Sequence, residues 1–209
     1  MDGERHIEEI GVGPHPLPWP SDGRLDPELL AGGDRRNVVD RFRYWTTEAI
    51  IAELDEHRHE FHVAVENFAH DFNIGSVVRT ANAFNAREVH IVGRRRWNRR
   101  GAMVTDRYQH VRHHDSVASL AGWARAEGLP VIGIDNLPGA VPLETYDLPR
   151  ACVLLFGQEG PGLSDEARGS CTATLSIAQY GSTRSINAGA AAAIAMHAWI
   201  RRHPFDQTP

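Results

Sequence analysis

The chain of 209 residues is 42% hydrophobic, which is enough for one sizeable core with an appendage but not for two full domains. No apolar run approaches the ~20 residues of a membrane span, and the acidic start is wrong for a signal peptide. We therefore expect a soluble, cytoplasmic protein without a membrane partner. The net charge of −5 argues against a uniformly basic nucleic-acid binder, and two cysteines are too few for a disulfide framework.

We divide the chain into an N-terminal arm with a helical extension, residues 1–59, and a main domain, residues 60–209. Proline alternates with other residues at positions 14–20, a pattern that cannot sustain a helix, so residues 1–36 are expected to form a mobile or surface-draped arm. Residues 38–59 carry apolar side chains at helical spacing and are predicted to form one or two helices.

The main domain alternates β-rich segments with helical ones. Strands are expected at residues 61–65, 88–92, 130–134 and 151–156, and helices at residues 74–84, 115–126 and 188–201. A short strand-like bridge joins two glycine-bearing loops near the end of the chain. This alternation predicts an α/β fold in which a parallel sheet is flanked by helices on both faces.

Positive charge is concentrated between residues 79 and 112, which carry nine arginines against two acidic residues. All 22 basic residues are arginines, whose planar guanidinium groups can bind phosphate through two hydrogen bonds at once. The densest part, residues 94–100, is called the arginine run here, and its candidate RNA-binding residues are Arg95, Arg96, Trp97, Arg99 and Arg100. We expect it to bind an RNA backbone while Trp97 offers a stacking surface; a solvated loop is the alternative.

Glycines cluster directly after the predicted strand at residues 151–156. Gly157, Gly160 and Gly162 follow its carboxyl end, where open α/β sheets bind ligands, although such a cluster also suits a simple tight turn. Their spacing matches neither the dinucleotide fingerprint nor the phosphate loop, which disfavours a Rossmann dehydrogenase and a nucleotide hydrolase. A second loop, residues 181–187, precedes a helix rich in alanine and glycine that lets other backbone pack very close.

Three segments carry a family resemblance: NIGSVVRTANAF at residues 73–84, LLFGQEGPGLS at 154–164 and SIAQYGSTRSINAGAAAAIAMHAW at 176–199. They resemble the signature motifs of the SpoU (TrmH-like) RNA ribose methyltransferases of the SPOUT superfamily. The resemblance covers roughly residues 61–202. It implies a deep C-terminal trefoil knot, S-adenosylmethionine as the cofactor with S-adenosylhomocysteine as its product, and a homodimer formed through the final helix and the knot.

The resemblance also implies a cofactor site held largely by backbone groups. Its candidate residues are Leu155, Gly157, Gly162, Ile177 and Ile186. The sequence departs from the family where Ile-Pro-Met is replaced by Ile-Ala-Gln at residues 177–179, and where Ser-Leu-Asn-Val-Ser is replaced by Ser-Ile-Asn-Ala-Gly at residues 185–189. Both changes keep the backbone role feasible, and they leave Gln179, Tyr180 and Arg184 able to face RNA.

The catalytic set that the resemblance implies is Asn73, Arg79, Glu159, Ser185 and Asn187. Keeping a guanidinium neutral at pH 7 would cost at least roughly 7 kcal/mol, so we interpret Arg79 as an electrostatic clamp on the phosphate and the developing alkoxide rather than as a base. Either asparagine could instead cap the helix that follows it. Glu159 could brace its loop or meet Arg79, and Ser185 is expected to hydrogen-bond to the substrate or to Asn187.

We therefore expect methyl transfer to a ribose 2′-hydroxyl of structured RNA. Transfer RNA is favoured over ribosomal RNA because residues 1–60 leave no room for the additional RNA-binding domain that many ribosomal members carry. Two alternatives come from other classes: an RNA-binding knot protein without catalysis, and a zinc hydrolase. The histidines at 57, 59, 62, 110, 113 and 114 lack paired cysteines and an H-E-x-x-H motif, so we expect surface or capping histidines and no metal.

Overall fold

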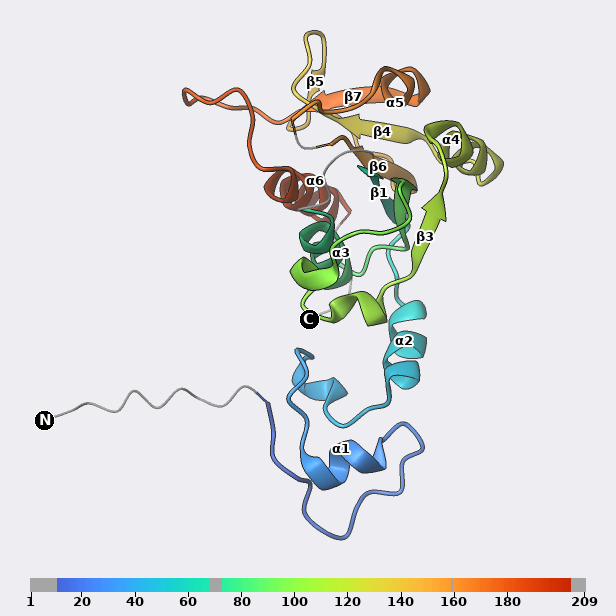
Figure 1. The fold of residues 1–209 in the computed structure, drawn as a ribbon, viewed down its shortest axis with the longest axis vertical. Coiled ribbons are helices and arrows are strands. Elements are labelled where there is room, and N and C mark those ends of the chain that lie inside the picture. The colour runs from blue at the N-terminus through green and yellow to red at the C-terminus, as the bar shows by residue number, and fades with distance from the viewer. Residues whose placement is uncertain (1–10, 68–72, 159, 204–209) are drawn as a thin grey trace, which may run out of the picture. The chain divides into compact units, whose positions relative to one another are not determined.

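The computed structural model describes residues 11–67, 73–158 and 160–203 of the chain (Figure 1). The chain forms two compact units, Met1–Glu56 and His57–Pro209. Within the described ranges, no helix combines the length and the apolar character needed to cross a membrane.

The first unit is built from short helices. Its elements are α1 (Pro27–Gly32), the 3-10 helix η1 (Asp40–Phe42) and α2 (Thr47–Asp55). The proline-rich stretch 14–20 is without helix, whereas α1 is an element that the sequence pattern did not indicate. It begins where Asp26 accepts hydrogen bonds from the backbone of Glu28 and Leu29, with proline at the first helical position.

A buried carboxylate organises this unit. Asp34 is fully buried and accepts hydrogen bonds from the Arg36 side chain (2.9 and 2.7 Å) and from the Tyr44 backbone (2.9 Å). Burial alone would raise the pKa of this carboxyl group, but the hydrogen bonds from Arg36 and Tyr44 outweigh it and lower the pKa to about 2. Residues of the expected arm therefore take part in a packed unit.

Seven strands within the described part of the second unit form one sheet in which every neighbouring pair is parallel. The strands are β1 (Phe61–Asn67), β2 (Val89–Gly93), β3 (Val111–His114), β4 (Val131–Ile134), β5 (Val141–Pro142), β6 (Cys152–Phe156) and β7 (Ala173–Ser176). Their order is β3-β2-β1-β6-β4-β7-β5. The sequence pattern missed β3, which is mostly polar, and β5, which has only two residues.

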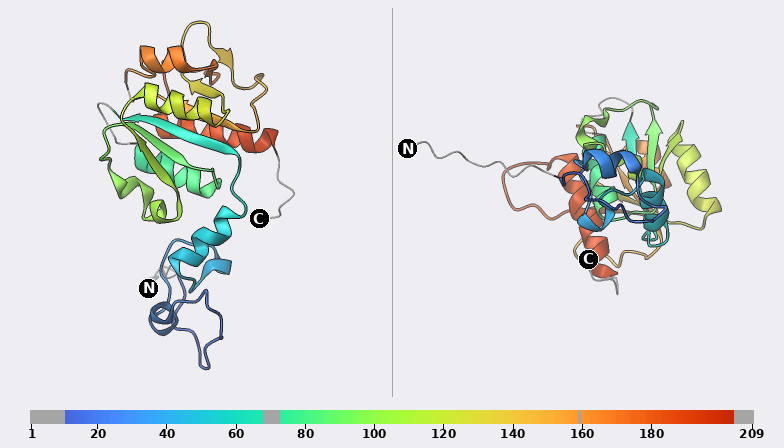
Figure 2. Two further views of the ribbon diagram at one scale, coloured as in Figure 1. Left: turned by 90° about the vertical axis from the view of Figure 1, so that its right-hand side faces the viewer. Right: turned by 90° about the horizontal axis from the view of Figure 1, so that it is seen from below.

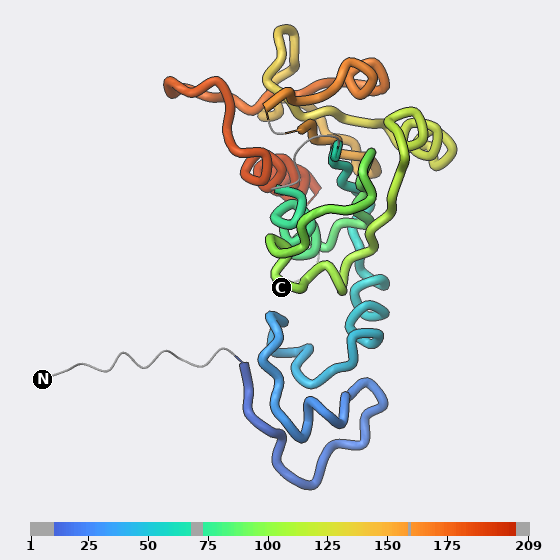
Figure 3. Tube along the Cα trace, in the orientation of Figure 1, coloured from blue at the N-terminus to red at the C-terminus, as the bar shows by residue number. Residues whose placement is uncertain are grey.

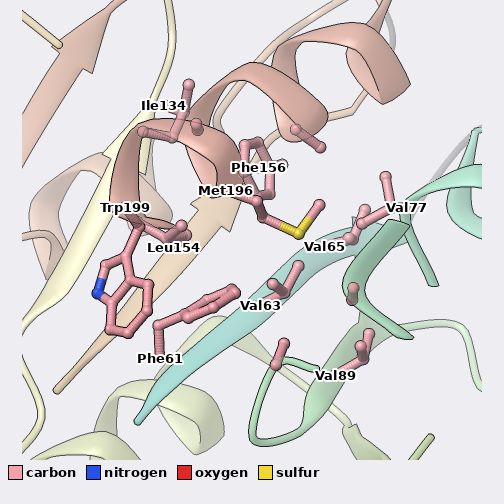
Figure 4. Close-up of a cluster of buried hydrophobic side chains, with 14 of the residues drawn as sticks. Phe61, Val63, Val65, Val77, Val89, Ile134, Leu154, Phe156, Met196 and Trp199 are labelled. Atoms are coloured by element: carbon pink, nitrogen blue, oxygen red, sulfur yellow. The ribbon is translucent and has the colours of Figure 1, made fainter. Parts of the chain in front are cut away.

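Helices cover both faces of the sheet, as the alternation of elements predicts (Figure 2). The elements outside the sheet are α3 (Ile74–Ala83), η2 (Arg99–Ala102), η3 (Thr105–Tyr108), α4 (Val117–Ala126), α5 (Asp165–Ser170) and α6 (Ala188–Arg202). Because side chains alternate along a strand, Phe61, Val63 and Val65 pack with α3 and α6, whereas Ala64 packs with α4 and α5. Figure 4 shows the hydrophobic cluster on the α3 and α6 face, in which Trp199 of α6 packs against Phe61 of β1.

The path of the chain after β7 matters for the site. The trace leaves β7, runs through an extended loop and enters α6, which packs on β4, β6 and α3 (Figure 3). The indole nitrogen of Trp199 anchors α6 by donating to the backbone oxygens of Pro149 (3.0 Å) and Arg150 (3.1 Å). This path is compatible with the trefoil knot that the resemblance implies.

Candidate active site

A cavity of ≈ 390 Å³ opens at the carboxyl ends of β4, β6 and β7. Four segments line it: the end of β4, the loop after β6, the loop after β7 and the start of α6. The structure therefore brings together Gly157 and Gly162 of one loop with Ile177 and Ile186 of the other. The volume of the cavity lies in the ordinary range for small-molecule sites, roughly 300–1,000 Å³.

Leu155 is the one candidate cofactor residue that does not line the cavity. Its side chain is fully buried with α4 and α5, on the opposite face of the sheet. The cause is strand alternation, because Leu154 and Phe156 point to the α6 face and Phe156 lines the cavity instead.

The loop after β6 has no room for side chains at two of its glycines. Gln158 and Gly162 exchange backbone hydrogen bonds of 3.0 Å in both directions, which closes the loop. A Cβ atom on Gly157 would collide with the backbone of Gly162 and Leu163, and one on Gly162 would collide with the Asp135 carboxylate. Gly162 also has φ +74°, a conformation that suits glycine.

Two carboxylates fasten the far end of this loop. Asp135 accepts a hydrogen bond from the Leu163 backbone (2.8 Å). Glu66, at the end of β1 and only 1% exposed, accepts from both the backbone (2.9 Å) and the hydroxyl (2.6 Å) of Ser164. Sequence reasoning missed both residues, although a polar residue at the carboxyl end of a predicted strand was an available signal.

The loop after β7 is fastened at its start and exposed further on. Asn136 accepts a hydrogen bond from the Ile177 backbone (3.2 Å), and Glu144 accepts one from the Ala178 backbone (3.0 Å). Residues 180–185 are exposed, and Tyr180 is exposed by 97%. The cavity therefore has one rigid wall next to an exposed loop.

The two candidate catalytic asparagines meet each other. The Asn187 amide donates to Asn73 Oδ1 (3.0 Å), and its own Oδ1 accepts from the backbone of Gly189 (3.0 Å) and Ala190 (3.2 Å). Asn187 thus caps α6, which was one of the two roles expected, whereas the Asn73 side chain makes no capping hydrogen bond to α3. The pair joins the N-terminal ends of α3 and α6, and Asn187 lines the cavity together with Ser185.

Arg79 projects from the exposed side of α3. Its guanidinium makes no hydrogen bond or ion pair with another residue that the structure describes, which leaves the charge available to a ligand. Glu159, the expected neighbour of Arg79, lies outside the described residues.

A model of the family described as "SpoU rRNA Methylase family" matches residues 60–197. The chain belongs to this family. A Mycobacterium bovis protein named "Uncharacterized tRNA/rRNA methyltransferase" is 33% identical over 158 residues, which cover 70% of this chain and 48% of that protein. The chain thus spans about half the length of the curated relatives it matches.

Solved structures of similar proteins have the same fold. The methyltransferase AviRb from Streptomyces viridochromogenes, solved with the cofactor AdoMet, superposes with a TM-score of 0.64 at 25% identity, covering 72% of this chain and 64% of that one. A solved structure described as giving "Structural insights into the 2-OH methylation of C/U34 on tRNA" has a TM-score of 0.60 at 26% identity, covering 69% of this chain and 97% of that one. These likenesses confirm the fold class predicted from the sequence.

In this SpoU domain the arginine run packs beside the start of α3. The Asn67 amide, at the end of β1, donates to the backbone oxygens of Arg94 (2.7 Å) and Arg96 (3.0 Å). A Cβ atom on Gly75 would lie 2.9 Å from the backbone oxygen of Asn98, so α3 approaches this segment without a side chain between them. The run is therefore held next to the helix that begins after Asn73 and carries Arg79.

Members of the arginine run differ in their surroundings. The side chains of Arg95, Arg96 and Arg100 are exposed. Arg99 pairs with Asp106 (3.3 Å) and lies over the Trp97 ring at 5.5 Å. Because Trp97 also packs against the core cluster, part of its expected stacking surface is already in use.

The prediction of surface or capping histidines is wrong for His62 and His114, which are 8% and 5% exposed. With the fully buried His90 they form a hydrogen-bonded chain across β1, β2 and β3, with nitrogen to nitrogen distances of 3.0 Å and 2.9 Å. Burial lowers the pKa of His62 to about 4 and that of His90 to about 2, and it also lowers the pKa of His114. The parallel register, which places these side chains on one face, could not be read from the sequence.

His62, Glu88 and His90 also form a trio of metal-binding residue types within the described ranges. However, the two imidazoles already pair with each other, and Glu88 pairs with Arg112 (3.0 Å). The match to a methylase family favours a methyltransferase over a zinc hydrolase.

Proposed function

We propose that this protein transfers a methyl group from S-adenosylmethionine to a ribose 2′-hydroxyl of RNA. The observation that carries the proposal is the cavity between the two glycine-bearing loops, beside the Asn73–Asn187 pair, in a chain of the SpoU family. The structure of AviRb in complex with AdoMet supports S-adenosylmethionine as the cofactor. The similar structure whose description names 2-OH methylation of C/U34 on tRNA supports methyl transfer to a 2′-hydroxyl.

The residues of the cavity fit this cofactor. Ile134, Phe156, Ile177 and Ile186 provide apolar walls for a purine. Because Gly157 has no side chain, the loop closes on itself there, and its glycines present main-chain groups to the cavity. When bound, S-adenosylmethionine supplies an electrophilic methyl group on its sulfonium.

The chain's own residues would stabilise the charge that develops on the ribose oxygen. Arg79 offers a cation without a partner among the described residues, and the N-terminus of the 15-residue α6 faces the cavity through Asn187 and Ala188. Ser185, which lines the cavity, would hydrogen-bond to substrate. Glu159 keeps its proposed role of bracing the loop or meeting Arg79.

RNA would be held by the arginine run next to α3. We favour transfer RNA over ribosomal RNA as the substrate. We also propose a homodimer formed through α6 and the knot, since the apolar side chain of Ile194 in α6 is 43% exposed. No metal is needed for this chemistry. We place the protein in the cytoplasm.

The test is incubation with labelled S-adenosylmethionine and unmodified total RNA, followed by separation of the RNA by size. We expect label in the transfer-RNA fraction. Label confined to ribosomal RNA would correct the substrate, and absence of label from all RNA would contradict the proposed activity.

A further inference from the structure

The side chain of Gln179 lines the cavity with a polar atom that has no partner. Its Oε1 atom is buried and makes no hydrogen bond to any residue of the described ranges. A buried carbonyl oxygen that lost its hydration without gaining a donor is destabilising. The amide therefore has an unmet requirement for a hydrogen-bond donor, and a turn about its last side-chain bond would bring the oxygen from the wall into the cavity.

The backbone that leads to Gln179 is held by neighbouring side chains. Ile177 and Ala178, directly before it, are tied through their backbone nitrogens to Asn136 (3.2 Å) and Glu144 (3.0 Å). The continuous run of exposed residues in this loop starts only after Gln179. Since the backbone is held up to this point, the unpaired oxygen is a feature of the cavity wall and not of the exposed loop.

The surrounding chemistry selects among the possible donors. Ile177, Ile186 and Phe156 line the same cavity and suit the flat apolar face of a purine, whose edge carries polar groups. Among the other polar residues of the wall, Asp135 at the end of β4 carries a carboxylate, which suits a cationic amino group. A neutral amide oxygen beside apolar side chains is best matched by a neutral N–H donor.

We propose that Gln179 Oε1 accepts a hydrogen bond from the exocyclic 6-amino group of the adenine of S-adenosylmethionine. The inference rests on the cofactor proposed above and adds a side-chain contact where the family resemblance leads one to expect methionine, which has no comparable acceptor. The contact gives the site a preference for a 6-amino purine over a 6-oxo purine, which presents an acceptor in place of the donor.

The experiment compares two ligands by calorimetry, S-adenosylhomocysteine and its 6-oxo analogue S-inosylhomocysteine. Wild-type protein is expected to bind the adenosyl ligand roughly 10-fold more tightly or better, and Gln179→Met should remove most of that preference. Gln179→Glu keeps a carbonyl-type acceptor and should retain the preference. Ser182→Ala, on the exposed part of the same loop, should leave both affinities unchanged.

Two results would overturn the contact. One is a Gln179→Met protein with the wild-type preference between the two ligands. The other is an effect of Gln179→Met that is lost with 5′-methylthioadenosine, which keeps the adenine but lacks the amino-acid part, because the oxygen would then serve the methionine end. If the wild-type protein bound none of these ligands, the proposed cofactor itself would be wrong.

Discussion

The buried histidine chain should make the fold lose stability in mild acid. His62 and His90 stay neutral in the folded protein because burial holds their pKa values at about 4 and about 2, below the ordinary 6.5. Below pH 6.5 the unfolded chain binds protons that the folded chain does not. Their contribution to stability is therefore complete above pH 6.5 and is lost as the pH falls toward 4 for His62 and toward 2 for His90.

The size of the effect follows from these values. At pH 5 the proton that the unfolded chain binds at each histidine removes about 2 kcal/mol, so the two together remove about 4 kcal/mol relative to pH 8. That is a large part of a typical unfolding free energy of roughly 5–15 kcal/mol. The Asp34 carboxyl group, with a pKa of about 2, does not contribute between pH 8 and pH 5.

Urea unfolding at pH 8 and pH 5, at equal ionic strength, measures this difference. The double variant His62→Gln, His90→Gln should show a weaker dependence on pH, and His110→Gln, at an exposed site, should keep it. Ring resonances of His62 and His90 in the folded wild-type protein should not titrate between pH 7.5 and 5. Equal stability at both pH values, or ring titration near pH 6.5, would refute the reasoning.

Three further predictions concern the site. Gly157→Ala should weaken cofactor binding strongly because its Cβ collides with the loop backbone, whereas Gly181→Ala, with open space around it, should not; equal calorimetric affinities would contradict this. Arg79→Ala should slow methyl transfer by roughly 100-fold or more while cofactor affinity stays within about twofold, and a parallel loss of affinity would move Arg79 into the cofactor site. Replacing the exposed arginines of the arginine run by glutamine should weaken RNA binding and flatten its salt dependence, and an unchanged salt slope would exclude the run.

The sequence predicted those parts of the fold that depend on local pattern. The apolar strands and the long helices were found because their periodicity is strong, and the glycine spacing located the loop after β6. The polar strand β3 was missed because Arg112 and His113 are not among the β-branched and large aromatic residues typical of strands. They are in a strand because they pair with β2.

The site itself was only partly predictable. Residues that contact each other through sequence-distant elements, such as Glu66 with Ser164, depend on which strands become neighbours. The side chain of Leu155 lies on the face away from the cavity because one residue along a strand changes the face of the sheet. The pairing of Asn73 with Asn187 likewise needed the packing of α3 against α6.

The most direct test of the central claim is the position of the transferred methyl group on RNA. Unmodified transfer RNA would be methylated with labelled S-adenosylmethionine and then hydrolysed in alkali, which cannot cleave beside a methylated 2′-hydroxyl. We predict label in alkali-resistant dinucleotides, and loss of that label with Arg79→Ala. Label released in mononucleotides would show methylation of a base and would contradict the account.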